Sequence, residues 1–238
     1  MLVKAVLFDL FETLLLVRKD ENRYKNCLKK LHEALMHDGV SVSFRDFRDA
    51  YFKARGKLYR KARDRLEEPH FSLRVSLALR EMGYDYSANH PIVRRAVKAF
   101  SDEFMRYIYP DEDAYHVLQT LHEKCKTGIV SNFAIPECAR ELISIHGLGD
   151  FLDVIVISAE INKRKPDPKI FNIALSSLGI KPKDAVFVGD TPDVDVKGAK
   201  KAGMKTILIE RRTEDSYAEI KPDITIKRLR ELLTIIDC

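Results

Sequence analysis

Four short segments of this chain place a polar or charged side chain just beyond a mostly apolar stretch. Asp9 directly follows residues 3–8, and Ser131 and Asp190 end two further runs of this kind. Lys165 lies in a polar loop that follows a fourth run. A carboxylate at the end of a buried strand is costly to desolvate unless a cation or hydrogen bonds accompany it. We therefore expect these four side chains to form one active site at one edge of one sheet.

The chemistry that Asp9 permits is covalent catalysis, because an aspartate can act as a nucleophile if it stays ionised and uncovered. The ammonium of Lys165 favours the ionised form, and so does a divalent cation. Asp190 and Asp195 offer oxygen ligands, and Mg²⁺ commonly uses one or two carboxylates together with substrate phosphate and waters. We expect Asp9, Asp190 and the backbone carbonyl of Phe11 to hold Mg²⁺. Asp195 is expected to lie at the same metal site.

Two neighbouring residues are expected to bind the group that is transferred. Ser131 and the amide of Asn132, together with backbone N–H groups after Asp9, can donate hydrogen bonds to a phosphoryl group. Each of these residues alone also fits a turn or a helix cap. Their order at successive sheet positions favours a site over that interpretation.

Short, unalternating apolar runs alternate with segments of helical periodicity in the second half of the chain. Strands are expected at residues 3–8, 126–131, 153–157, 185–189 and 205–209, with a short one at 224–226. Helices are expected at residues 113–124 and 168–178, with a short one at 195–203 that ends in glycine. This alternation predicts an α/β fold with a doubly wound parallel sheet. Such sheets bind ligands beyond the carboxyl ends of their strands, where Asp9, Ser131 and Asp190 fall.

The segment between the first strand and the rest of the sheet is helical in pattern and contains no convincing buried strand. Helices are expected at residues 24–36, 44–65, 71–82 and 91–107. We interpret residues 16–107 as an inserted helical cap over the strand ends. Residues 1–15 and 108–238 are then the catalytic core.

Composition sets broad limits on location and partners. The chain has 238 residues, of which 45% are hydrophobic and 32% charged, as expected for a packed core. Its net charge of +5 suits a small anionic substrate, and no aromatic-basic motif supports nucleic-acid binding. The four cysteines do not form a close pair in the sequence, and no apolar run approaches the length of a membrane span. We expect a cytoplasmic protein, a monomer or homodimer, with no membrane partner.

The ordered set of motifs resembles the haloacid dehalogenase superfamily, in the branch with a helical cap inserted after the first motif. The matching sequences are FDLFETL at residues 8–14, IVSN at 129–132, KPDP at 165–168 and GDTPDVD at 189–195. The resemblance implies a Rossmann-like core in which Asp9 is the nucleophile and Ser131 binds the transferring group. It further implies that Lys165 neutralises charge, that Asp190 holds Mg²⁺, and that Asp195 supports either the waters of the metal or Lys165.

One position departs from the pattern of the family's phosphatases, which usually carry a second Asp two residues after the nucleophile. This chain has Phe11 there, and a phenyl ring cannot transfer a proton. General acid–base catalysis is worth roughly 10²–10⁴-fold, so an alkoxide leaving group would leave slowly. Glu12 and a cap residue such as His70 are the alternatives for a substitute acid.

An aromatic residue at this position resembles the 2-haloacid dehalogenases, in which the aspartate attacks carbon and no metal is needed. Asp190 favours the opposite interpretation, because those enzymes carry Ser and Asn where this chain has Gly189 and Asp190. A further carboxylate would also repel a carboxylate substrate. The favoured function is a Mg²⁺-dependent phosphatase of a small phosphorylated metabolite. The alternative is a metal-independent 2-haloacid dehalogenase that makes a 2-hydroxy acid, and a non-catalytic binding protein is the third reading.

Overall fold

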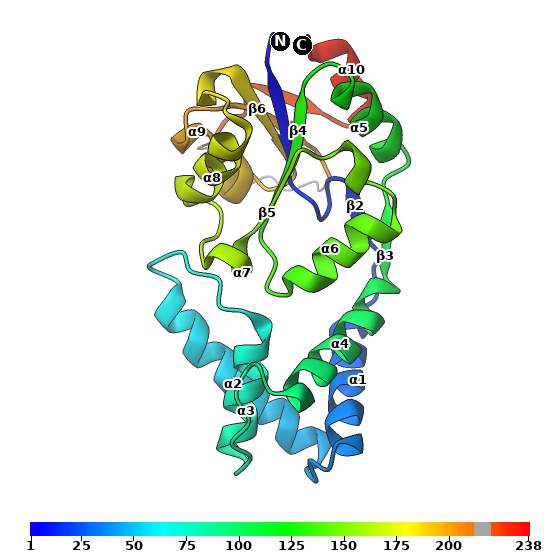
Figure 1. Cartoon of the computed structure of the whole chain (residues 1–238), viewed down its shortest axis with the longest axis vertical. Coiled ribbons are helices and arrows are strands. Elements are labelled where there is room, and N and C mark those ends of the chain that lie inside the picture. The colour runs from blue at the N-terminus through cyan, green and yellow to red at the C-terminus, as the bar shows by residue number, and fades with distance from the viewer. Residues whose placement is uncertain (212–219) are drawn as a thin grey trace.

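The structure, a computed structural model, describes residues 1–211 and 220–238. Its main feature is a six-stranded parallel sheet with helices on both faces, so the predicted α/β, doubly wound fold is confirmed (Figure 1). Across the sheet the strands are β5 (Val154–Ile157), β4 (Lys126–Ser131), β1 (Ala5–Phe8), β6 (Ala185–Gly189), β7 (Lys205–Ile209) and β8 (Ile224–Ile226).

The register of the central strands places three of the expected side chains at one edge. Phe8 in β1 lies opposite Ile129 in β4 and Val188 in β6. Asp9, Ser131 and Asp190 all follow within two residues of this row, and the N–H of Asp9 still donates to the carbonyl of Val188 at 2.8 Å. The parallel direction of the strands therefore gathers these residues at their carboxyl ends.

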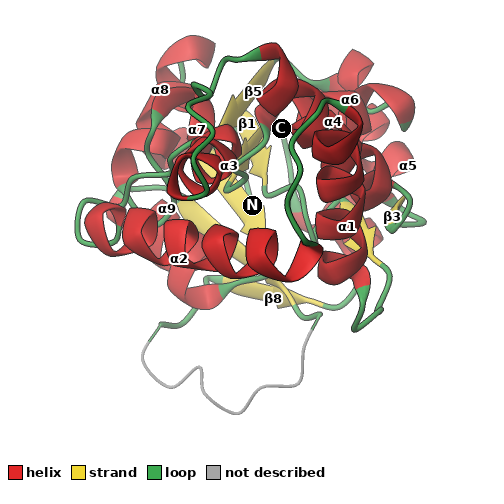
Figure 2. Ribbon diagram, turned by 90° about the horizontal axis from the view of Figure 1, so that it is seen from below, coloured by secondary structure: helices red, strands yellow, loops and turns green. Residues whose placement is uncertain are grey.

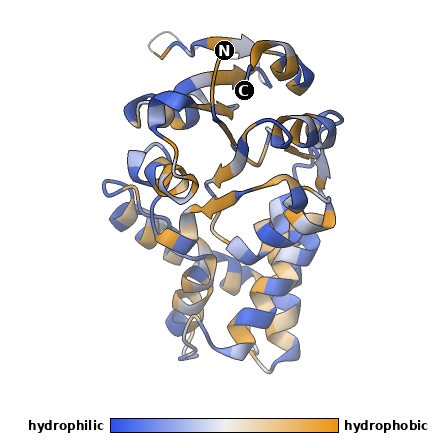
Figure 3. Ribbon diagram, turned by 45° about the horizontal axis from the view of Figure 1, so that its top comes forward, coloured by the Kyte–Doolittle hydropathy of each residue, from blue (hydrophilic) through white to orange (hydrophobic). Residues whose placement is uncertain are grey.

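The two faces of the sheet have separate cores, because successive side chains on a strand point to opposite faces. Ala5 and Leu7 belong to one cluster, which α8 (Pro168–Leu178) and α9 (Lys197–Lys201) cover. Val6 and Phe8 belong to the other, which includes residues of α5 (Ala114–His122), α6 (Pro136–Ile145) and α10 (Leu232–Ile235). In the hydropathy colouring the central strands are mostly hydrophobic, whereas the helices carry both hydrophobic and hydrophilic residues (Figure 3). Both faces are thus buried, as the unalternating runs predict.

Four helices lie together beyond the carboxyl ends of the strands. They are α1 (Arg23–His37), α2 (Phe44–Ala62), α3 (Phe71–Glu81) and α4 (Pro91–Met105). The Ser43 side chain begins α2 by accepting a hydrogen bond from the N–H of Asp46 at 3.1 Å. Seen from below, α2 and α3 lie across the strand ends (Figure 2). The division into a core and a cap of residues 16–107 stays a prediction, and its first boundary falls inside a strand.

That strand is β2 (Leu15–Val17), which pairs antiparallel with β3 (Ile108–Pro110) where the chain leaves and re-enters the core. Residues 16 and 17 of β2 lie in the inserted segment but are only half-buried, so the expectation of no convincing buried strand there is not contradicted. Three-residue strands carry too little periodicity to be seen in a sequence. The helix expected at 195–203 also differs: a π-helical turn, Pro192–Val196, precedes α9. The short α7 (Ser158–Ile161) then leads from β5 to the loop of Lys165.

Candidate active site

Lys165 lies at the centre of the carboxyl edge of the sheet. Its Nζ is 2.6 Å from Oδ1 of Asp9 and 2.7 Å from Oδ1 of Asp195. The residue is only 2% exposed, and its ammonium also lies 5.1 Å from the centroid of the Phe187 ring. Burial acts to lower the pKa of Lys165, but the charges of Asp195 and Asp9 outweigh it and raise that pKa. The side chain therefore stays a cation between two carboxylates.

Asp9 is poised between its charged and neutral forms. Burial raises its pKa to about 7, and the neighbouring Asp195 and Asp190 act in the same direction. The ammonium of Lys165 opposes them and lowers the pKa. A cation next to Asp9 would favour the ionised form that a nucleophile needs.

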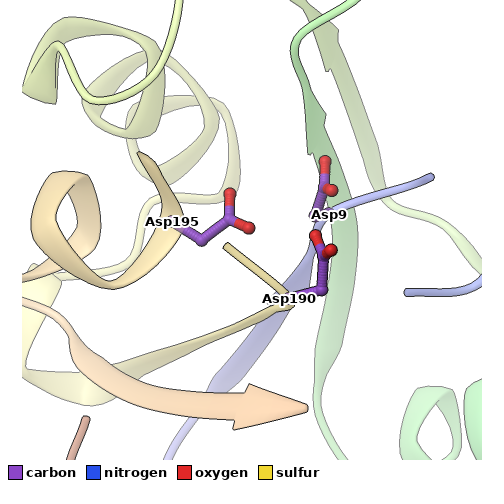
Figure 4. Close-up of side chains that lie close together, drawn as sticks. All are labelled: Asp9, Asp190 and Asp195. Atoms are coloured by element: carbon purple, nitrogen blue, oxygen red, sulfur yellow. The ribbon is translucent and has the colours of Figure 1, made fainter. Parts of the chain in front are cut away.

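Three aspartates form a cluster whose geometry suits a hard cation. One carboxylate oxygen from each of Asp9, Asp190 and Asp195 lies within 4.8 Å of the others (Figure 4). Because Mg²⁺ binds oxygens at about 2.0–2.1 Å, ligands on opposite sides of the ion are about 4.2 Å apart, so a small approach of these side chains would bring the three oxygens within reach of one ion. Asp195 has other contacts, since its Oδ2 accepts from the N–H of Thr191 at 3.0 Å and its Oδ1 faces Lys165. The donor set thus fits Mg²⁺ best with Asp9 and Asp190 as ligands and Asp195 behind them.

The cluster lines a cavity of about 240 Å³ that also includes Phe11, Glu12 and Ser131. The hydroxyl of Ser131 is buried and has no hydrogen-bond partner within the described part of the chain. A buried polar group without a partner is costly. This hydroxyl is therefore available to a ligand in the cavity beside Asp9.

The side chain of Asn132 contacts the backbone of the loop that carries Lys165. Its Nδ2 donates to the backbone carbonyl of Lys165 at 3.0 Å, and its Oδ1 accepts from the N–H of the same residue at 2.8 Å. Both ends of the amide therefore hold the backbone of Lys165. Each bond uses one donor or acceptor of this amide, and the expectation that the amide of Asn132 donates to a transferring group stays a prediction.

The ring of Phe11 belongs to an aromatic cluster as well as to the cavity wall. It lies 4.7 Å from the ring of Phe133 and 5.9 Å from that of Phe104 at the end of α4. Of the two substitute acids considered, Glu12 lines the cavity beside Asp9 and His70 does not. His70 instead contacts Ser72 and Glu137 and lines a separate cavity of about 770 Å³.

Two arginines at the site were missed by sequence reasoning. Arg164 lines the cavity, donates its N–H to the carbonyl of Leu66 at 2.9 Å and faces the buried Glu68 at 3.5 Å. It therefore joins the α2–α3 connection to the loop of Lys165. Arg211 binds the loop that follows Asp9. Because Arg164 directly precedes Lys165 in the sequence, it could have been expected near the site. Nothing in the sequence connects Arg211 to residue 12.

A doubly wound sheet with a lysine and clustered aspartates at its carboxyl edge defines an α/β enzyme, and comparisons with known proteins identify its family. The sequence profile of the haloacid dehalogenase-like hydrolases matches residues 3–203. A protein from Methanopyrus kandleri named glyceraldehyde 3-phosphate phosphatase is 33% identical in an alignment of 247 positions, gaps included. The alignment covers 99% of this chain and 97% of that protein.

Two solved structures have the same fold over nearly the whole chain. A HAD phosphatase from Thermococcus onnurineus is 25% identical with a TM-score of 0.66, and the match covers 98% of this chain and 97% of that one. A 2-haloacid dehalogenase from Pseudomonas syringae pv. Tomato is 23% identical with a TM-score of 0.73 and the same coverage, a likeness of fold alone. This chain belongs to the haloacid dehalogenase-like hydrolases, as its four motifs predict.

Proposed function

We propose that this enzyme is a Mg²⁺-dependent phosphatase of a small phosphorylated metabolite, with Asp9 as its nucleophile. One observation carries the proposal: Asp9 shares a cavity with the unpartnered hydroxyl of Ser131 and forms an ion pair with the buried Lys165. The name of the Methanopyrus kandleri relative supports the same class of reaction. The charge of the site supports the requirement for Mg²⁺. Three carboxylates and one ammonium leave a net charge of −2 when all are ionised, and such a charge attracts a divalent cation.

The residues of this chain have distinct tasks in such a reaction. A carboxylate oxygen of Asp9 attacks phosphorus, the bond to the leaving oxygen breaks, and water later hydrolyses the phosphoaspartate. Lys165 holds Asp9 ionised and in place, while Ser131 donates a hydrogen bond to a phosphoryl oxygen. Bound Mg²⁺ would supply positive charge to the phosphoryl oxygens. Asp195 and Asn132 act through Lys165, which they hold from the side chain and the backbone.

The aromatic surroundings of Phe11 favour some leaving groups over others. A leaving oxygen beside this ring receives no proton from residue 11, so the rate depends on how well the group leaves unprotonated. Aryl and acyl phosphates meet this condition better than alkyl phosphates do. We therefore expect faster turnover of p-nitrophenyl phosphate than of a simple alkyl phosphate.

The test is a panel of aryl, acyl and sugar phosphates, glyceraldehyde 3-phosphate included, assayed with Mg²⁺ and with EDTA. We expect phosphate release that requires Mg²⁺ and that falls by at least about 10³-fold in Asp9→Asn, since the nucleophile is lost. Lys163→Met serves as a matched control, because Lys163 lies in the same loop and pairs at 3.4 Å with Asp167 rather than with Asp9.

The dehalogenase alternative has its own readout in the same experiment. Release of chloride from L-2-chloropropionate in EDTA, without phosphatase activity, would contradict the proposal. Phe11 is the observation that favours this alternative, whereas Asp190 beside Asp9 opposes it. Tight ligand binding without any turnover would instead support the binding-protein reading.

The proposal also covers the partners and the location of the protein. The proposal includes a small anionic substrate and no nucleic acid. Among the described residues, none of the helices combines the length and apolar character that a membrane crossing requires. A cytoplasmic location and a monomeric or homodimeric state stay predictions.

A further inference from the structure

The guanidinium of Arg211 binds two carbonyl groups of the loop that follows Asp9. Its Nε donates to the carbonyl of Glu12 at 3.2 Å, and its Nη2 donates to the carbonyl of Thr13 at 3.1 Å. Arg211 lies two residues after β7, and its side chain is only 17% exposed. A planar guanidinium is suited to such a contact, because its N–H groups form a rigid fork.

The loop that Arg211 binds is closed on itself and contains an unfavourable backbone conformation. The N–H groups of Leu14 and Leu15 both donate to the carbonyl of Leu10, at 3.0 and 2.8 Å. Glu12 lies inside this turn, between Leu10 and Leu14, and has φ of 58°. This left-handed conformation costs a non-glycine residue about 1–2 kcal/mol. Such a conformation persists when surrounding contacts enforce it. The two bonds from Arg211 are contacts of this kind.

The same guanidinium also binds the segment by which the chain returns to the core. Its Nη2 lies 2.6 Å from Oδ2 of Asp111, which is 7% exposed. The N–H of Asp111 in turn donates to the carbonyl of Leu14 at 2.9 Å. Arg211 therefore connects the loop after Asp9 with the segment around Asp111, by which the chain returns to the sheet.

We propose that Arg211 is a positioning residue for the metal site. It fixes the loop of residues 9–13, so that the carboxylate of Asp9 and the carbonyl of Phe11 keep the spacing that Mg²⁺ requires. Mg²⁺ demands near-ideal octahedral geometry, so a small movement of this loop weakens binding more than it weakens the fold. The inference rests on the proposed function, because it concerns the affinity of that site for Mg²⁺.

The test is a calorimetric titration of Mg²⁺ into the full chain without substrate, for wild type, Arg211→Gln and Arg211→Lys. We expect the Kd for Mg²⁺ to rise about 10–100-fold in Arg211→Gln, the range typical of groups that orient metal ligands. Arg211→Lys is expected to fall between the two, because lysine keeps a charge near Asp111 but lacks the planar fork. The rise in Tm on adding Mg²⁺ should be largest in the wild type, smaller in Arg211→Lys and smallest in Arg211→Gln.

Arg230→Gln is the matched control. Arg230 binds Asp113 at 2.6 Å, two residues from Asp111, but is 53% exposed and does not contact the loop of Asp9. Its Kd for Mg²⁺ should match that of the wild type. Asp111→Asn replaces Arg211→Gln if the latter does not fold, and should raise the Kd by a smaller factor.

Two outcomes separate this inference from the proposed function. A lower Tm in Arg211→Gln with a Kd within about twofold of the wild type would make Arg211 merely structural and overturn the inference. Wild-type protein that neither binds Mg²⁺ nor hydrolyses any phosphate would overturn the proposed function itself, and the inference with it.

Discussion

Replacement of Lys165 by methionine tests whether the ion pair at the centre of the site is real and buried. Methionine keeps most of the volume but removes the charge that lies 2.6 Å from Asp9 and 2.7 Å from Asp195. The side chain of Lys165 is 1% exposed and those of the two aspartates are 13% and 2% exposed. The variant therefore leaves two poorly solvated carboxylates close together without their cation.

The expected loss of stability follows from this burial. Removing one partner of a buried ion pair costs about 3–5 kcal/mol. In a chain of this size each kcal/mol lowers Tm by about 2–4 °C, so we expect Lys165→Met to lower Tm by about 6–20 °C in EDTA. Because Lys165 lowers the pKa of Asp9, its loss raises that pKa above about 7 and protonates the nucleophile at neutral pH. Turnover of p-nitrophenyl phosphate should fall by at least about 10²–10³-fold.

A double variant makes the prediction sharper. Asp195→Asn removes one of the two uncompensated carboxylates, so Lys165→Met with Asp195→Asn should be more stable than Lys165→Met alone. The assay is thermal unfolding of the single and double variants in EDTA, with Lys163→Met from the same loop as control; Lys163 is 25% exposed and pairs with Asp167 rather than with Asp9. A loss below about 1 kcal/mol in Lys165→Met, or a double variant less stable than the single one, would refute the reasoning.

Two further predictions concern packing and pH. In Gly189→Ala the new Cβ would lie 2.5 Å from Cγ and Oδ2 of Asp195, so we expect a loss of about 1–3 kcal/mol and slower turnover; Gly149→Ala, whose nearest contact is 3.9 Å away, should change neither unfolding nor rate. The pH prediction concerns Asp153. Burial acts to raise the pKa of this carboxyl, but the hydrogen bonds from Lys126 and from the N–H of Thr127 outweigh burial and lower that pKa. The stabilisation by ionised Asp153 is therefore fully present above the ordinary pKa near 3.9 and is lost as pH falls through the lowered pKa. Asp153→Asn should lower Tm at pH 7, and the difference from wild type should shrink as the pH is lowered below that ordinary value.

Much of the fold could be predicted because each main strand has its own local signal. β4, β6, β7 and β8 begin and end at the residues that the apolar runs indicate, and α8 spans Pro168–Leu178 as expected. These runs need only local periodicity and turn residues to be recognised. Parallel pairing then brings the strand ends together without further information.

The parts that could not be predicted depend on contacts between residues far apart in the sequence. The amide of Asn132 has free donors and acceptors in any sequence reading, and only the fold shows that Lys165 occupies both ends. Arg211 and Glu12 are separated by 199 positions. Sequence reasoning found the candidate reacting groups, whose residue types are distinctive, but not the contacts that hold them in place, because those residue types are common.

Phe11 and Asp190, which favour different reactions, have different surroundings in the structure. Phe11 contributes to a cluster with Phe133 of the core and Phe104 of α4, so its ring stabilises the contact between the sheet edge and the helices beyond it. Asp190, by contrast, adds negative charge next to Asp9, which helps only when a cation is present. A 2-haloacid would bring a further carboxylate to this cluster, whereas a phosphate with Mg²⁺ would bring a compensated charge. The ring of Phe11 therefore contributes to the contact with α4, and the carboxylate of Asp190 contributes to the charge that a substrate would meet in this cavity.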